Sequence, residues 1–332
     1  MDFYVCSERH TLDNITTQLS TIANDWGIAD KIVACVHDGA SNVKEAGARN
    51  DWVDVHCAAH VLHLCISAAI GVNKTASTKP IARCIGAASH LVMHFHHSPL
   101  ATNELLKKQL EMKPNEPTKK LIQHCKTRWN SAFHMMERLV ELRWPVVAVL
   151  SDRDVTKLSD ARTLDLKEDN WILMKQLLPV LQPLQMVTAM LSAECSPPAS
   201  ICIPMIWGLL NNHMAAKVDD SDAVRQFKAD TKQELTSRFP LSEQDVTHSL
   251  VVASVADPAH KHLRAFPPDV RAAAHNNVRA LLRDIALPAQ DDNQASSPAA
   301  KRHCPGLAFI LGDDYAGTSP ETPQLMQSLT TT

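Results

Sequence analysis

The stretch that decides the fold is Lys31-Ile-Val-Ala-Cys-Val-His-Asp-Gly-Ala-Ser-Asn42. Residues 32–36 form a short apolar run, mostly of β-favouring side chains, which predicts a strand covered on both faces. Asp38 follows at the carboxyl end of this strand, Gly39 permits a tight turn, and Ser41 or its neighbour can cap the next helix. Ligands and metals bind at this edge of open α/β sheets, so Asp38 is a candidate site residue. The alternative is that Asp38 and Ser41 only shape the turn.

The flanking segments predict a βαβ unit. Apolar residues at helical spacing over 8–26 predict an amphipathic helix, and a short helix is expected over about 42–48. The alternation of residues 52–56 predicts a second strand, and an unbroken apolar segment predicts a helix from about Ala58 to Ile70. Strand, helix and strand in this order require a parallel pair with a right-handed crossover. Two strands do not form a sheet that is stable alone, and no later segment predicts a strand of comparable quality.

The rest of the chain predicts helices. They are expected over 81–110, from Ser131, over Trp171–Leu191, over 223–239 and over 269–287. The composition after residue 287 turns to Gln, Asp, Ser, Ala and Pro, which is typical of a disordered linker. We therefore expect a sheet-containing unit over 1–72, a helical region over 73–287 and a disordered linker and tail over 288–332.

Composition narrows the class of protein. The chain has 332 residues, of which 45% are hydrophobic, so most of it is expected to fold. Its nine cysteines are odd in number and scattered, and no signal peptide is recognised, which favours a reducing compartment. Residues 195–216 carry no formal charge, but their prolines and asparagines argue against a membrane span. We expect no contact with a membrane.

Charge is unevenly distributed along the sequence. The formal net charge is −3, yet residues 74–128 contain ten basic and three acidic residues, a local charge of +7. Such a segment can face nucleic-acid phosphates. A solvated lysine-rich surface gives the same count, and the sequence leaves both interpretations open.

Short motifs occur in a fixed order over about residues 8–270. They are His10-Thr-Leu-Asp-Asn-Ile15, Val36-His-Asp-Gly-Ala-Ser-Asn42, Cys57-Ala-Ala-His-Val-Leu-His-Leu64, Thr127-Arg-Trp-Asn-Ser131, Pro198-Ala-Ser200 and Asp257-Pro-Ala-His-Lys261. Each is weak alone, but together they resemble the hAT family of DNA transposases, specifically the domesticated relatives with a BED-type zinc finger. The resemblance implies a mixed α/β, mostly helical fold, in which a large all-α insertion interrupts a ribonuclease H-like core that is incomplete here.

The resemblance also implies an expectation about catalysis. In such cores three carboxylates hold two divalent ions that activate water or a DNA 3′ hydroxyl. Asp38 matches the second carboxylate, whereas the first and third, like the BED finger, are expected outside this chain; Glu194 lies in a different motif context. One carboxylate cannot position two magnesium ions. We therefore expect a truncated or decayed copy that is not an enzyme and needs no cofactor, with Mg²⁺ required only by a full-length active transposase.

Two groups of residues are candidate metal ligands. Cys57, His60, His63 and Cys65 have zinc-like spacing, but one helix cannot direct all four at one ion, so no metal is expected. The resemblance instead implies that Cys57 and His60 form a structural wall beside Asp38. A second group, His90, His94 and His97, shares a helical face, which is more typical of a polar helix surface than of a metal site.

Arg128 and Trp129 are the candidate DNA-binding residues. Arginine can clamp a phosphate and tryptophan can stack on an unpaired base, which is the role that the resemblance implies for Trp129. The alternative is that Trp129 packs beneath the following helix. The leading hypothesis is a nuclear, non-catalytic protein that binds DNA or protein partners, including copies of itself through the exposed edge of the sheet. The alternatives are a fragment of an active, metal-dependent DNA strand-transferase and a helical protein-interaction scaffold.

Overall fold

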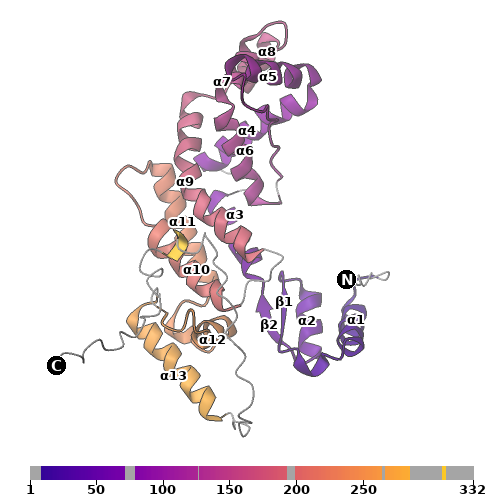
Figure 1. Cartoon of the computed structure of the whole chain (residues 1–332), viewed down its shortest axis with the longest axis vertical. Coiled ribbons are helices and arrows are strands. Elements are labelled where there is room, and N and C mark those ends of the chain that lie inside the picture. Colours follow the sequence, from indigo (N-terminus) through magenta and orange to yellow (C-terminus); the bar gives the residue numbers. More distant parts are fainter. Residues whose placement is uncertain are drawn as a thin grey trace, which may run out of the picture.

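The computed structural model describes residues 9–71, 79–125, 127–192, 199–263, 266–284 and 309–311. This part of the chain is mostly helical, with one small parallel sheet that projects from the side of an elongated helical body (Figure 1). Lys74, Lys126, Glu194 and nearly all of the linker and tail predicted over 288–332 lie outside the described residues.

The N-terminal unit confirms the predicted βαβ order. Its elements are α1 (Leu12–Asp25), η1 (Ala29–Lys31), β1 (Ala34–His37), α2 (Ser41–Arg49), β2 (Val53–His56) and α3 (Ala58–Ile70). The strands pair in parallel, in a register that runs from Ala34 opposite Val53 to His37 opposite His56. The first strand starts two residues later than the apolar run suggests, because only the second half of that run pairs with β2.

Helix α2 covers one face of the sheet, and the described residues cover the other face only in part. On the covered face, α2 lies so close that a Cβ on Gly47 would come within 3.0 Å of the Cβ of Cys35. On the other face Val36 and Val53 are 63% and 48% exposed, whereas Val55, which pairs with Val36, is 7% exposed and belongs to the hydrophobic core. The prediction of a strand covered on both faces is therefore wrong within the described part of the chain.

The helical body begins at α3 and continues through the middle of the chain. Its next helices are α4 (Pro80–His97), α5 (Pro99–Met112), α6 (Trp129–Glu141), α7 (Arg143–Ser151), α8 (Leu158–Leu164) and α9 (Glu168–Leu191). The single helix expected over 81–110 is two helices, because the Ser98 hydroxyl accepts from the amide of Ala101 and Pro99 opens a new first turn. No helix within the described ranges is long and apolar enough to span a bilayer.

The C-terminal part of the body packs back onto its beginning. It consists of η2 (Ala199–Ile201), α10 (Cys202–Gly208), η3 (Leu209–His213), α11 (Asp222–Arg238), η4 (Glu243–Asp245), α12 (Ser249–Ala256) and α13 (Pro268–Asp284). Helix α11 lies along α3, and one hydrophobic core extends from Val55 to Leu311. A boundary near residue 72 therefore does not separate two cores, because α3 contributes its buried side chains to the helical body.

Three residues of the predicted disordered tail are ordered and packed. Ile310 is fully buried, and its carbonyl accepts a hydrogen bond of 3.0 Å from the side-chain amide of Asn212. A Cβ on Gly208 would lie 2.6 Å from the same carbonyl oxygen, so only glycine permits this approach. The prediction of a disordered tail over 288–332 therefore fails at residues 309–311.

Candidate functional site

A hydrogen-bonded histidine–aspartate pair joins the two strands: His37 ends β1, and Asp54 is the second residue of β2, opposite Cys35. The Nε2 atom of the buried His37 lies 2.5 Å from Oδ1 of Asp54, and Lys44 Nζ lies 3.2 Å from Oδ2 of the same carboxylate. The backbone N–H of Gly39 donates to Nδ1 of His37 at 2.9 Å. Because Nδ1 accepts, the neutral imidazole carries its proton on Nε2 and donates it to Asp54. The hydrogen bond from His37 lowers the pKa of Asp54; burial opposes this, and Lys44 adds to it.

This pair belongs to the one candidate metal-ligand cluster found among the described residues, which His56 completes. The ligand atoms of His37, Asp54 and His56 all lie within 4.8 Å of one another. However, both nitrogens of His37 are engaged, and Asp54 is engaged by His37 and Lys44, so a metal would have to displace these contacts. Transition metals usually take three or four protein ligands, and magnesium prefers oxygen. The donor set therefore does not fit a resident metal in this arrangement. The sequence prediction did not include this cluster. The pattern that could have indicated it is the placement of Asp54 and His56 two positions apart on one strand.

Asp38 has the contacts of a turn residue. Its side chain is exposed, and Oδ1 accepts the backbone N–H of Ala40 at 3.1 Å, an Asx-turn that leads into α2. Its carboxylate is not part of the metal-ligand cluster found in the described part of the chain. The turn-shaping interpretation accounts for the observed contact, and a remnant catalytic role for Asp38 stays a prediction.

Cys57 and His60 lie where the second strand leads into α3. The backbone N–H of Cys57 donates to the carbonyl of His37 at 2.7 Å, which ties the start of α3 to the end of β1. The rings of His60 and His63 are 6.0 Å apart, and burial, together with His60, lowers the pKa of His63. Cys65 is fully buried, and burial raises the pKa of its thiol to about 12. Within the described residues its sulfur is not part of a metal-ligand cluster.

The second histidine group lines a cavity of about 370 Å³. His90, His94 and His97 of α4 face Asp160 and Thr163 of α8 across it. Within the described ranges their ring nitrogens do not gather into a ligand cluster. Their arrangement is that of a polar helix surface.

Most lysines of the basic segment are neutralised by ion pairs. Lys107, Lys108 and Lys113 lie within 3.0 Å of Glu104, Glu111 and Glu116, respectively. Lys79 pairs with Asp230 at 2.7 Å, and Lys119 pairs with Glu141. Of the segment's ten basic residues, eight are described, and three of these have no ion pair with a described residue: Arg83, Lys120 and Arg128. The segment is thus largely a solvated, ion-paired surface.

The two candidate DNA-binding residues differ in their exposure to solvent. Arg128 is exposed at the N-cap of α6, where its carbonyl accepts the Ser131 hydroxyl at 2.6 Å. Trp129 is only 2% exposed and belongs to the hydrophobic core. A side chain at that depth cannot stack on a base. The prediction of base stacking is therefore replaced by the alternative, in which Trp129 packs in the core at the start of α6. Arg128 remains available as a phosphate contact.

Two distant motifs of the sequence meet in the tertiary structure. The Ser200 hydroxyl donates to Oδ2 of Asp257 at 2.5 Å, and the Ala259 amide donates to Oδ1 at 2.8 Å. Burial works to raise the pKa of Asp257, but these hydrogen bonds outweigh it and the pKa is lowered. The Ser254 hydroxyl donates to the Ser200 carbonyl at 2.8 Å, so this contact fastens η2 to α12. The contact between the two motifs thus stabilises the packing of η2 against α12.

Comparisons with known proteins match part of this chain. A family model described as the ZBED1 RNase-like helical domain matches residues 55–179, from β2 to the middle of α9. Zinc finger BED domain-containing protein 4 of Homo sapiens is 24% identical over 207 residues, which are 62% of this chain and 16% of that protein. The chain thus spans a small part of the length of this relative. Over the matched residues the chain is thus similar to zinc finger BED proteins.

Proposed function

We propose that this chain binds DNA in the nucleus and neither cuts nor joins it. The observation that carries the proposal is the state of two carboxylates of the sheet unit, Asp38 just after β1 and Asp54 within β2. Asp38 caps a turn, and Asp54 is engaged by both His37 and Lys44. Two-metal catalysis needs carboxylates that are free to bridge and coordinate two divalent ions.

DNA binding is supported by the similarity to zinc finger BED proteins and by the exposed side chain of Arg128. An arginine without an ion pair among the described residues can donate two parallel hydrogen bonds to a phosphate. A lysine held by a neighbouring glutamate first has to leave its partner. Arg128 is therefore the contact we propose within the basic segment.

Replacing Arg128 with alanine is expected to weaken binding to a labelled DNA duplex and to lower the salt dependence of log K by about 1, the loss of one phosphate contact. Fluorescence anisotropy at several salt concentrations measures both quantities. Arg162→Ala is the matched control, because Arg162 is also exposed and unpaired within the described structure but lies on α8. Equal binding by Arg128→Ala and the wild type would remove Arg128 from the interface.

The same duplex tests the absence of catalysis. Incubation of the wild type with Mg²⁺ or Mn²⁺ is expected to yield neither nicked nor joined products on a denaturing gel. Any product that disappears in Asp38→Asn would overturn the proposal and favour an active strand-transferase.

A second candidate function, self-association, is favoured by the partly exposed face of the sheet. Val36 and Val53, which lie on the same face of the two strands, are 63% and 48% exposed. Exposed apolar strands with unpaired edges pair readily with another chain. We propose that a second copy of the chain covers this face.

Light scattering coupled to size-exclusion chromatography is expected to show a concentration-dependent dimer for the wild type. Val36→Lys should remain monomeric, because burying an unpaired ammonium in the interface is costly. Val218→Lys is the control, since Val218 is fully exposed elsewhere on the surface. A wild-type monomer at all concentrations would exclude this association.

A further inference from the structure

Helix α13 has one face packed on the body and another left to solvent. Val270 and Ala274 are buried against the body, and the side-chain amide of Asn277 donates to the carbonyl of Val246 at 3.0 Å. These contacts fix the rotation of the helix about its axis. A second face of α13 carries basic side chains. They recur every four residues, at Arg271, His275 and Arg279, and therefore share this face.

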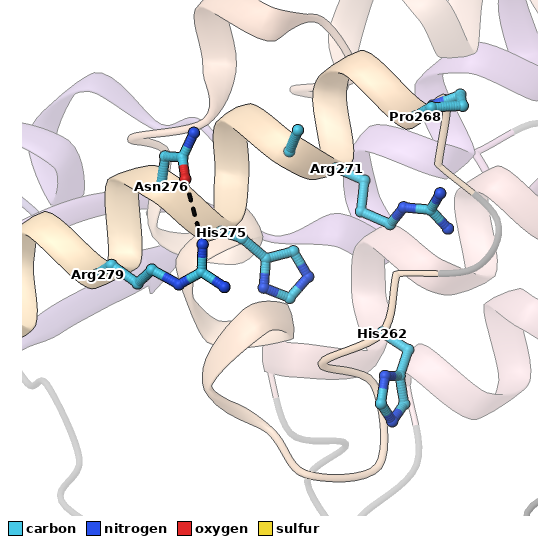
Figure 2. Close-up of a pocket in the computed structure, with 7 residues that line it drawn as sticks. His262, Pro268, Arg271, His275, Asn276 and Arg279 are labelled. Atoms are coloured by element: carbon cyan, nitrogen blue, oxygen red, sulfur yellow. Dashed lines mark hydrogen bonds between the residues drawn. The ribbon is translucent and has the colours of Figure 1, made fainter.

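These side chains line a groove of about 600 Å³, which we call the α13 groove. Its lining consists of His262, Pro268, Arg271, Ala272, His275, Asn276 and Arg279. Figure 2 shows Arg271, His275 and Arg279 along the helix, with His262 on the loop that precedes it. None of the lining residues is acidic.

The arginines of the α13 groove are not neutralised within the described structure. Neither Arg271 nor Arg279 forms an ion pair with a described residue, and Arg279 donates only to the Asn276 side-chain oxygen, at 3.3 Å. Burial lowers the pKa of His275, and the positive charges of Arg279, Arg271 and His262 lower it further. The groove thus concentrates positive charge that an anion would offset.

We propose that the α13 groove binds the phosphate backbone of DNA, an inference that rests on the proposed DNA-binding function and assigns it a surface. Eight residues of helix separate Arg271 from Arg279, which places their Cα atoms about 12 Å apart along the axis. At that spacing the two guanidinium groups can each contact a different phosphate of a DNA strand, whose phosphates are regularly spaced. The groove has no Phe, Tyr or Trp side chain in its lining, so we expect contacts with the backbone rather than base readout.

The double variant Arg271→Ala/Arg279→Ala tests the groove. We expect its affinity for a DNA duplex to fall by about tenfold or more at low salt, and the salt slope of log K to fall by about 2. The loss should be the same for duplexes of unrelated sequence. The matched control is Arg162→Ala, because Arg162 is exposed and has no ion pair within the described structure but lies on α8, away from the helix that carries the groove. Circular dichroism and thermal melting should be unchanged in both variants.

The outcomes separate this inference from the function on which it rests. If the wild type binds no duplex, both the proposed function and the groove fail. If the wild type binds, and the double variant binds equally well with an unchanged salt slope, the groove alone is excluded. If poly-glutamate displaces the duplex at equal charge concentration, the groove is a site for acidic protein segments and the assignment to DNA is overturned.

Discussion

Replacing Asp220 with alanine is expected to lower the free energy of unfolding by about 3–5 kcal/mol, the usual cost of removing one partner from a buried ion pair. Lys228 of α11 is 2% exposed, and its Nζ lies 2.7 and 3.0 Å from the two carboxylate oxygens of Asp220. The carbonyl of Ala215 accepts a third hydrogen bond from this ammonium at 3.1 Å. Without Asp220 the ammonium stays buried with no counter-charge.

Urea unfolding followed by circular dichroism measures this loss. The double variant Asp220→Ala/Lys228→Met should recover most of it, because removing both charges leaves no unpaired ion in the core. The matched control is Asp222→Ala, whose carboxylate pairs with Arg225 but is fully exposed, so no measurable change is expected. Equal midpoints for Asp220→Ala and Asp222→Ala would show that the pair contributes nothing.

The contribution of Asp220 should disappear in acid. Burial opposes ionisation of Asp220, but the amide of Lys217 and the ammonium of Lys228 outweigh it, so the pKa lies below the ordinary value of 3.8. A carboxyl whose pKa is lowered in the folded state stabilises the protein above its unfolded pKa. This stabilisation is lost as the pH falls through the folded pKa. The difference between the wild type and Asp220→Ala should therefore be full at pH 7 and shrink below about pH 4.

Replacing Trp129 with alanine is expected to cost about 3–5 kcal/mol of folding free energy, because the side chain is only 2% exposed and leaves a large cavity. Trp129→Phe should cost much less. It keeps an aromatic ring in place and removes a buried indole N–H for which the described residues provide no acceptor. Urea unfolding of the two variants measures both effects, and Trp144→Ala is the control, since Trp144 is 65% exposed.

DNA binding by the same variants decides the role of Trp129. The folded Trp129→Phe variant should bind duplex and single-stranded DNA as well as the wild type, because a core side chain makes no contact with DNA. A folded Trp129→Phe variant with strongly reduced affinity for single strands would restore the base-stacking role.

Local structure was predictable where it depends on neighbours in the sequence. The order of α1, β1, α2, β2 and α3 follows from apolar periodicity, and the parallel pairing follows from the helix between the strands. The limits of α9, α11 and α13 lie within three residues of those expected. The break between α4 and α5 was signalled by Ser98 and Pro99 but overlooked.

The candidate site was less predictable, because its chemistry depends on partners that are distant in the sequence. A count of lysines over 74–128 cannot reveal that Lys119 meets Glu141 or that Lys79 meets Asp230. The sequence also does not reveal that His37 donates to Asp54 across the sheet, which changes the ligands available to a metal.

Periodicity, turn residues and motif order are properties of neighbouring residues, and they were enough to predict most of the secondary structure, the parallel strand pair and the similarity to zinc finger BED proteins. Only the tertiary structure decided that Trp129 is buried, that most lysines of the basic segment are ion-paired and that the arginines of the α13 groove are not. The physical reason is that burial and charge compensation depend on which helix surfaces meet, and packing of the whole chain fixes that choice.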